Sequence, residues 1–321
     1  MTAFRGSGSF VATYLVTGGA GFIGSHLAEA LITRGDAVRV VDDLSTGRLE
    51  NLAHLPSVEF VQGDLSDPAV AVSVMRGVDY VLHEAAIPSV ARSVADPARS
   101  NRANVDATLN VLLAARDARV RRLVFAGSSS VYGNTPGLPK DESMPTSPSS
   151  PYAVQKLAGE QYCQLFHRLY GLETVVTRYY NVFGPRQDPG APYSGVISLF
   201  TMALLEGRTP LILGDGEQSR DFTYVGNVVN GVLRALAAPD VAGEVFNVAT
   251  GHRVSLLRLL STLAGLIGVE TAPAFGEARA GEVRDSQADI GKARRLLGYE
   301  PAIPFEEGLR QTVAWYRGGR A

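Results

Sequence analysis

The feature that most constrains the fold of this chain is a glycine-rich turn that directly follows a strand-like segment. Residues 14–17 form a short apolar run, residues 18–24 (GGAGFIG) contain four glycines, and a helical pattern of apolar residues follows. Glycine lets the backbone turn tightly and approach a pyrophosphate closely, and the start of the next helix attracts phosphate. This arrangement predicts a dinucleotide site at Gly18, Gly21 and Gly24.

Short apolar runs alternate with helical patterns through the first half of the chain. Such β–α alternation favours an α/β fold with a doubly wound parallel sheet of the Rossmann type, covered by helices on both faces. We expect strands at residues 14–17, 37–41, 58–61, 80–83, 123–126 and 174–178, and helices at residues 68–76, 104–116 and 151–170.

The pattern changes after about residue 182, where glycine and proline become frequent. We expect a smaller C-terminal α/β lobe that binds the substrate, with a cleft between it and the nucleotide-binding lobe. Within residues 183–321 we expect helices at 196–206, 227–238, 255–266 and 305–317, and strands at 211–213 and 244–248. The expected division is a flexible extension at 1–12, a dinucleotide-binding domain at 13–182 with 224–250 returning to it, and the smaller lobe at 183–223 and 251–321.

Composition excludes several classes of protein. Apolar residues make up 45% of the chain, charged residues 19%, and the net charge is −2, so nothing suggests a nucleic-acid partner. No apolar run approaches the roughly 18 residues of a membrane span. The single cysteine excludes an intramolecular disulfide and a multi-cysteine zinc site, and the histidines are scattered, so we expect no metal. A cytoplasmic protein without a membrane partner is expected.

An acidic residue stands at the end of the second expected strand. Asp42 lies 18 residues after Gly24. A carboxylate at this place can accept hydrogen bonds from the ribose hydroxyls of an adenosine, and it repels a 2′-phosphate. The sequence therefore favours NAD over NADP.

A tyrosine and a lysine share one face of an expected helix. Ser150 can cap this helix and Pro151 can occupy its first position, which places Tyr152 and Lys156 four residues apart near its start. A nearby ammonium lowers the pKa of a phenol from its usual value of about 10. We therefore expect Tyr152 to serve as a base near neutral pH.

Three serines follow the strand expected at residues 123–126. Ser128, Ser129 and Ser130 would lie at the carboxyl end of that strand. Open α/β sheets bind their ligands at this edge. Small hydroxyl side chains there are typical of a ligand site, although a serine-rich turn that binds no ligand would show the same sequence pattern.

Taken in order, these motifs resemble those of the nucleotide-sugar epimerase/dehydratase group of the extended short-chain dehydrogenases/reductases. The resemblance covers nearly all of residues 13–316. It rests on TGGAGFIGSH (17–26), VVDDLSTG (40–47), GDL (63–65), HEAA (83–86), SSSVYG (128–133), YAVQK (152–156), RYYNVFGPRQ (178–187), GDGEQSRDF (214–222) and RAGEVRDSQAD (279–289).

The resemblance implies bound NAD, a UDP-sugar substrate, and Tyr152, Lys156 and Ser128 as the catalytic residues. Tyr152 would be the acid/base, Lys156 would bind the nicotinamide ribose, and Ser128 would contact the reacting hydroxyl. The implied cofactor-binding residues are Gly18, Gly21, Phe22, Ile23, Gly24, Asp42, Asp43, Ser45, Thr46, Gly47, Asp64, Leu65, Ala85, Ala86, Asn104, Tyr152, Lys156 and Tyr179. The implied substrate-binding residues are Ser89, Val90, Ser128, Ser129, Tyr152, Asn181, Ser194, Val196, Arg220, Arg279 and Ser286.

The serine run separates the members of this group. The resembling 4,6-dehydratases carry Thr-Asp-Glu where this chain has Ser128, Ser129 and Ser130, and UDP-glucuronate decarboxylases usually carry Glu at the place of Ser130. Here the additional acid and base are missing. The resemblance therefore favours an epimerase acting at carbon 4 of a UDP-hexose through a 4-keto intermediate.

Substrate choice depends on Ser286, which stands where strictly hexose-specific members carry a bulky tyrosine. A small residue leaves room for an N-acetyl group, so UDP-GlcNAc/UDP-GalNAc and UDP-glucose/UDP-galactose are both expected substrates. A UDP-glucuronate 4-epimerase or another nucleotide-sugar epimerase/dehydratase is the alternative. A non-catalytic NAD-sensing regulator is disfavoured, since Tyr152 and Lys156 are both present.

Two further expectations follow from the resemblance. The helices at residues 104–116 and 151–170 resemble those that pair two subunits, so we expect a homodimer built through a four-helix contact. Glu84 is an unusual charge for a position between a strand end and the cofactor.

Overall fold

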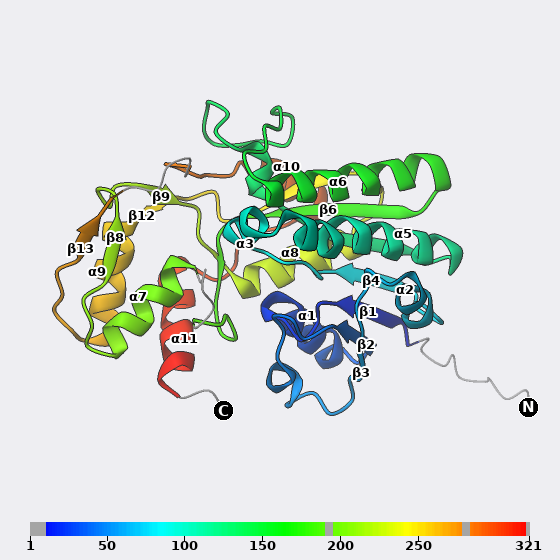
Figure 1. Cartoon of the computed structure of the whole chain (residues 1–321), viewed down its shortest axis with the longest axis horizontal. Helices are drawn as coiled ribbons and strands as arrows, with labels where there is room; N and C mark the ends of the chain where they lie inside the picture. The colour runs from blue at the N-terminus through cyan, green and yellow to red at the C-terminus, as the bar shows by residue number, and fades with distance from the viewer. Residues whose placement is uncertain (1–10, 190–194, 278–282, 319–321) are drawn as a thin grey trace, which may run out of the picture.

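A computed structural model of the chain describes residues 11–189, 195–277 and 283–318. Its centre is a seven-stranded parallel sheet (Figure 1) in the order β11-β6-β5-β4-β1-β2-β3. The expected Rossmann-type fold is confirmed. The strand order changes direction at β1, which pairs with β2 on one side and β4 on the other. The strands are β1 (Thr13–Thr17), β2 (Ala37–Asp42), β3 (Glu59–Gln62), β4 (Tyr80–His83), β5 (Arg122–Ser128), β6 (Glu173–Tyr179) and β11 (Val245–Val248).

Helices cover both faces of the sheet, and each face has its own buried apolar cluster. Leu27 of α1 and Val232 of α8 belong to one cluster, whereas Val111 of α5 and Phe166 of α6 belong to the other. Burial on both faces explains why the strands are nearly continuous apolar runs. The helices are α1 (Phe22–Thr33), α2 (Pro68–Val74), α3 (Val90–Ala95), α4 (Pro97–Asn101), α5 (Ala107–Asp117), α6 (Pro151–Tyr170) and α8 (Val225–Ala237).

The helix expected at residues 104–116 begins differently in the structure. Residues 102–106 form a π-helical turn, and α5 starts only at Ala107. The side chain of Asn104 explains the wider turn, because it inserts toward its neighbours. Its Oδ1 accepts a hydrogen bond from the Ile87 amide at 2.7 Å, and its Nδ2 donates to Gln155 Oε1 at 2.8 Å.

The smaller lobe surrounds a third apolar cluster that includes Phe183, Phe200, Leu259 and Leu309. In Figure 1 this lobe lies beside the carboxyl ends of the sheet strands. Its elements are β7 (Val182–Phe183), α7 (Val196–Leu205), β8 (Leu211–Leu213), β9 (Ser219–Arg220), β10 (Thr223–Tyr224), β12 (Val254–Ser255), α9 (Leu256–Ile267), β13 (Ala274–Gly276) and α11 (Phe305–Arg317).

Helix α10 (Gly291–Leu297) departs from the expected division of the chain. It packs against α8 and β11 of the sheet rather than against the other C-terminal helices. The exact boundaries of the two lobes stay a prediction. Across the part of the chain that the structure describes, no helix has the length and apolar character needed to cross a membrane.

Candidate active site

A cavity of about 920 Å³ runs along the carboxyl ends of the sheet strands and reaches the smaller lobe. Its wall begins at the turn between β1 and α1, passes the ends of β2, β4, β5 and β6, and ends at residues 181–188 and 283–286. Ligands of open α/β sheets bind where the strand order changes direction. The cavity includes that place, so it is the candidate active site.

Most of the predicted site residues lie on this cavity. Those that line it are Gly18, Gly21, Phe22, Ile23, Gly24, Asp42, Asp43, Ser45, Thr46, Gly47, Asp64, Leu65, Ala85, Ala86, Ser89, Ser128, Ser129, Tyr152, Tyr179, Asn181, Arg220 and Ser286. Asn104, Lys156, Val90 and Val196 are described but do not line it. Ser194 and Arg279 lie outside the described residues.

The glycine-rich turn brings segments of main chain close together at the N-terminus of α1. Gly18 has a φ of +64°, and a Cβ there would lie 2.8 Å from the backbone of Ala85. A Cβ on Gly24 would lie 2.4 Å from the carbonyl oxygen of Gly18. Any side chain at these two positions would displace the main chain, which explains the glycines. The turn therefore exposes its amides and the N-terminus of α1 to the cavity.

Asp42 is held between this turn and the next loop. Its Oδ2 accepts a hydrogen bond from the Ala20 amide at 3.0 Å, and its Oδ1 accepts one from the Leu44 amide at 2.8 Å. Burial raises the pKa of the carboxyl, and the backbone donors oppose this shift. A carboxylate has about four acceptor sites, so Asp42 retains capacity for ribose hydroxyls.

Tyr152 is presented to the cavity by the first turn of α6. Ser150 caps this helix by accepting a hydrogen bond from the amide of Ala153 at 3.2 Å, as the sequence predicts. The amide of Tyr152 donates to Ser93 Oγ at 3.0 Å, which fixes α6 against α3. On the facing wall the hydroxyls of Ser128 and Ser130 are 2.8 Å apart. The phenol of Tyr152 is thus placed beside a pair of serine hydroxyls.

The electrostatics of Tyr152 differ from the expectation. Burial raises the pKa of its phenol to about 12, although a hydrogen bond with Ser128 lowers it. Lys156 is not among the groups that lower it, and its ammonium instead donates to the carbonyl oxygen of Ala126 at 2.8 Å. The nearby carboxylate of Glu84 also raises the phenol pKa. Lys156 alone therefore does not bring the phenol pKa toward neutrality, and the role of Tyr152 as a base stays a prediction.

The smaller lobe contributes a linked set of polar groups at the other end of the cavity. Asn181 Nδ2 donates to Ser286 Oγ and to the carbonyl oxygen of Asp221, both at 3.1 Å. The guanidinium of Arg220 donates to the carbonyl oxygen of Arg284 at 2.6 Å. These contacts tie residues 181, 220 and 286 into one wall.

Four basic residues on the cavity wall were not among the predicted site residues, namely Arg48, Arg92, Lys140 and Arg186. Arg186 donates to Ser25 Oγ at 3.3 Å and forms an ion pair with Glu29. Lys140 donates to Thr135 Oγ1 at 2.9 Å. Arg186 belongs to the motif RYYNVFGPRQ, so that motif was a signal for it. Lys140 lies in the loop that follows the serines, and no motif in the sequence around it predicts that it reaches the cavity.

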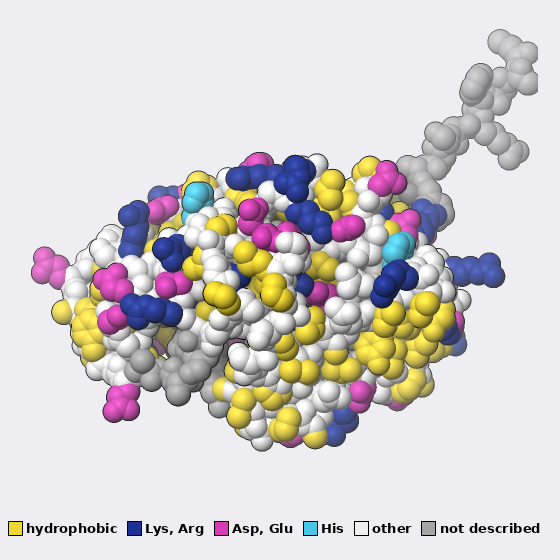
Figure 2. All heavy atoms as spheres, turned by 90° about the horizontal axis from the view of Figure 1, so that it is seen from above, with side chains coloured by type: hydrophobic (Ala, Val, Ile, Leu, Met, Phe, Trp, Pro, Cys, Tyr) yellow, Lys and Arg dark blue, Asp and Glu magenta, His cyan; other side chains and the backbone are white. Residues whose placement is uncertain are grey.

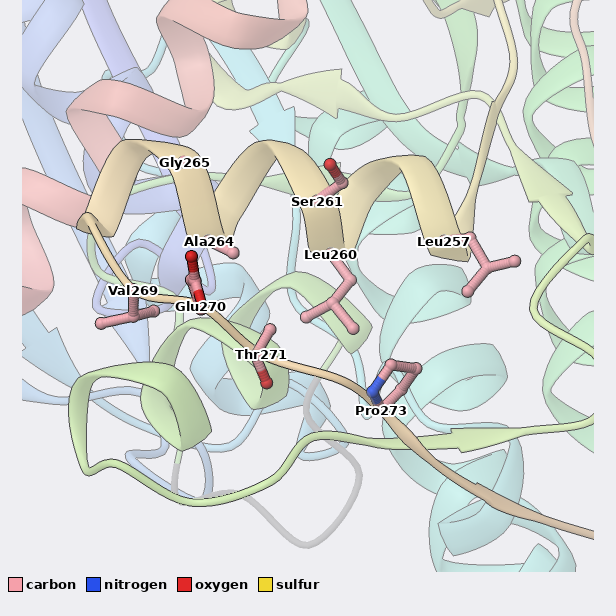
Figure 3. Close-up of a pocket in the computed structure, with 9 residues that line it drawn as sticks. All are labelled: Leu257, Leu260, Ser261, Ala264, Gly265, Val269, Glu270, Thr271 and Pro273. Carbon is pink, nitrogen blue, oxygen red and sulfur yellow. The ribbon is translucent and has the colours of Figure 1, made fainter.

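A second hollow, of about 570 Å³, lies between α9 and residues 269–273. Figure 3 shows the side chain of Leu260 pointing from α9 toward Thr271 and Pro273, whereas Ser261 points away. This hollow shares no residue with the large cavity. It lacks a convergent set of polar groups, so it is a weak candidate for catalysis.

Comparison with known proteins decides the family. The sequence profile of the NAD dependent epimerase/dehydratase family matches residues 14–249. The chain belongs to this family. The match covers the glycine-rich turn, the serines and the Tyr152–Lys156 pair.

The similarity to individual members of the family covers almost the whole chain. A UDP-glucose 4-epimerase of Mycolicibacterium smegmatis is 42% identical over 94% of this chain and 98% of its own length. A UDP-N-acetylglucosamine 4-epimerase structure from Methanobrevibacter ruminantium, in complex with UDP-N-acetylmuramic acid, has a TM-score of 0.92, 40% identity and coverage of 96% and 99%. A Thermus thermophilus UDP-glucose 4-epimerase complexed with NAD has a TM-score of 0.88, 37% identity and coverage of 96% and 99%.

The described residues fit the dinucleotide that gives the family its name. Gly18, Gly21 and Gly24 of the β1–α1 turn line the cavity without side chains that would keep a pyrophosphate away from the main chain. The amides at the start of α1 and the Asp42 carboxylate suit a pyrophosphate and a ribose. The cavity then continues past Ala85 to Tyr152, which gives one continuous space from the adenosine end to the phenol.

Proposed function

We propose that this chain catalyses NAD-dependent epimerisation at carbon 4 of a UDP-hexose through a transient 4-keto intermediate. The observation that carries the proposal is that Tyr152 and Ser128 lie on the same cavity as the glycine-rich turn. Ser129 and Ser130 stand where a dehydratase carries its additional acid and base. The 4-epimerases among the relatives, at about this level of identity over nearly the full length, support the same reaction.

In this mechanism, bound NAD+ supplies the hydride acceptor and a positive charge beside the reacting carbon. Tyr152 removes the proton of the carbon-4 hydroxyl and later returns it to the sugar after the keto group has turned over. Ser128 orients that hydroxyl through the hydrogen bonds that it shares with Ser130 and Tyr152. One phenol serves both half-reactions, so the chain needs no second ionisable group at the sugar.

The phenol must become a base in the loaded site. In the ligand-free protein its pKa is raised to about 12 by burial. A cation within about 4–6 Å favours the ionised form of an acid. Within the chain, the hydrogen bond with Ser128 lowers the phenol pKa. Lys156 lies on the same helix, one turn further along.

The proposed reaction can be tested with the protein as purified. We expect it to interconvert UDP-GlcNAc with UDP-GalNAc and UDP-glucose with UDP-galactose without added NAD, because the cofactor is regenerated in each turnover. Chromatography of the nucleotide sugars measures both reactions, and UDP-glucuronate forms a third arm. If no sugar is converted, the proposal is wrong. Conversion of UDP-glucuronate alone would favour the alternative epimerase.

We propose that Ser286 sets the size of the sugar pocket. Its hydroxyl accepts from Asn181 on the cavity wall, so a larger side chain there would project into the space beside the sugar. The variant Ser286→Tyr is expected to lower kcat/KM for UDP-GlcNAc relative to UDP-glucose by about tenfold or more. Ser286→Ala, which keeps the space, should preserve the wild-type ratio. An equal loss for both substrates in Ser286→Tyr would contradict a role in selection.

We also propose a homodimer through a four-helix contact of α5 and α6. Helix α6 exposes several apolar side chains, namely Val154, Leu165, Leu169 and Tyr170. Figure 2 shows hydrophobic side chains gathered on the right half of the molecule, where Figure 1 places α5 and α6. Sedimentation of wild type and Leu169→Asp distinguishes monomer from dimer, because a charge at position 169 should weaken the dimer.

The cytoplasm stays the expected location of the protein.

A further inference from the structure

Glu84 is a carboxylate on the active-site cavity that the proposed reaction does not use. It follows the last residue of β4 and lines the cavity between the glycine-rich turn and Tyr152. Its Oε1 accepts a hydrogen bond of 2.7 Å from the hydroxyl of Tyr179, at the end of β6. An acid in a partly buried place, with one neutral donor, requires a further partner or loses its charge.

Ionisable groups face Glu84 from α6 and β6. Lys156 and Tyr152 on α6 interact electrostatically with its carboxylate, and Tyr179 donates to it from β6. Its chain neighbour His83 is buried and engaged by two threonine hydroxyls, and burial lowers the His83 pKa to about 3, so it is neutral. Lys156 is thus the cation that faces Glu84 among these groups.

The charges of the pair depend on each other. Burial raises the pKa of Glu84 to about 7, while the Tyr179 hydrogen bond and Lys156 oppose this shift. Burial lowers the pKa of Lys156 to about 8, while Glu84 opposes that shift. Each group therefore favours the charged form of the other. Near neutral pH the pair therefore changes between a state in which both groups are charged and a state in which Glu84 is protonated and Lys156 is charged.

We propose that Glu84 is a positioning residue that compensates the charge of Lys156 and thereby keeps the bound dinucleotide oxidised between turnovers. This inference rests on the proposed function in one respect only, the binding of a nicotinamide dinucleotide in the cavity. The oxidised nicotinamide ring carries a positive charge and the reduced ring is neutral. A fixed carboxylate nearby favours the oxidised form, and an uncompensated ammonium favours the reduced form.

The variant Glu84→Gln tests this inference because glutamine keeps an acceptor for Tyr179 but carries no charge. Holoenzyme is equilibrated with defined NAD+/NADH mixtures, unbound dinucleotide is removed, and the bound fraction of NADH is read from its fluorescence. No sugar is required. At a pH of about 7.5, where both groups carry their charges, Glu84→Gln should bind NADH in preference to NAD+ by at least about tenfold more than wild type does, since one charge about 10 Å away at an effective dielectric constant of about 20 has at least that effect.

The pH dependence supplies a second readout in the unaltered protein. Protonation of Glu84 should make wild type resemble Glu84→Gln, so its preference should move toward NADH as the pH falls through about 7. The variant should show a weaker change over the same range. Glu142→Gln is the matched control, since Glu142 is also a partly buried acid with a pKa raised by burial, accepts from the Asn247 amide at 2.7 Å and does not line the cavity.

Three results would separate the possibilities. Equal NAD+/NADH preference in wild type and Glu84→Gln at a pH of about 7.5 would overturn the role of Glu84, even if epimerisation is confirmed. A shift of the same size in Glu142→Gln would also overturn it, because the effect would then be general. If wild type retained neither dinucleotide, the proposed function would fail, and the role of Glu84 with it.

Discussion

The variant Tyr152→Phe is expected to lower kcat by roughly 10²- to 10⁴-fold, the usual contribution of a positioned acid–base group. The phenol is the group that can exchange a proton with the sugar beside Ser128, and phenylalanine keeps its ring but removes that oxygen. Binding of UDP-sugar and of NAD should remain nearly unchanged, since the amide of Tyr152 still donates to Ser93. Calorimetric titration with UDP-glucose and the epimerisation assay measure the two effects separately.

A second tyrosine on the same helix provides the control. Tyr162 of α6 is partly buried, packs beside the apolar cluster of α5 and α6, and does not line the cavity. Tyr162→Phe should therefore keep wild-type turnover. Loss of sugar binding in Tyr152→Phe, with intact binding in Tyr162→Phe, would identify Tyr152 as a structural residue and remove the basis of the proposed mechanism.

Sequence reasoning located the parts of the site that depend on local structure. The turn at Gly18 and the start of α6 at Pro151 both follow from short-range rules, namely the positive φ that glycine allows and the cap that Ser150 provides. Helix α6 and strand β4 have the bounds expected from the sequence. Local periodicity and caps suffice when one segment of chain determines the geometry.

The contacts that set the charges of the site could not be predicted in this way. Tyr179 and Glu84 are 95 residues apart, and the acceptor of the Lys156 ammonium lies 30 residues before it. The spacing of Tyr152 and Lys156 on α6 does not reveal where the ammonium points, so the sequence could not give the direction of the phenol pKa shift that burial produces. The π-helical turn at Asn104 likewise depends on Ile87 and Gln155.

The variant Glu160→Gln is expected to reduce the free energy of unfolding by about 3–5 kcal/mol, the usual cost of removing one partner of a buried ion pair. Arg178 of β6 donates to both carboxylate oxygens of Glu160, with Nε at 2.9 Å and Nη2 at 2.5 Å. The two side chains are 4% and 3% exposed, so glutamine would leave a nearly water-free guanidinium without a counter-charge. Urea unfolding followed by circular dichroism measures the change.

This pair also fixes the catalytic helix, since Tyr152, Lys156 and Glu160 are spaced four residues apart and Glu160 anchors their face of α6 to β6. The double variant Glu160→Leu/Arg178→Met removes both charges and should recover most of the lost stability, because apolar replacements of buried ion pairs are often neutral. The Arg178 guanidinium lies 4.6 Å from the centre of the Tyr132 ring, a contact that methionine can partly replace. If Glu160→Gln and the double variant were equally destabilised, packing rather than the stranded charge would account for the loss.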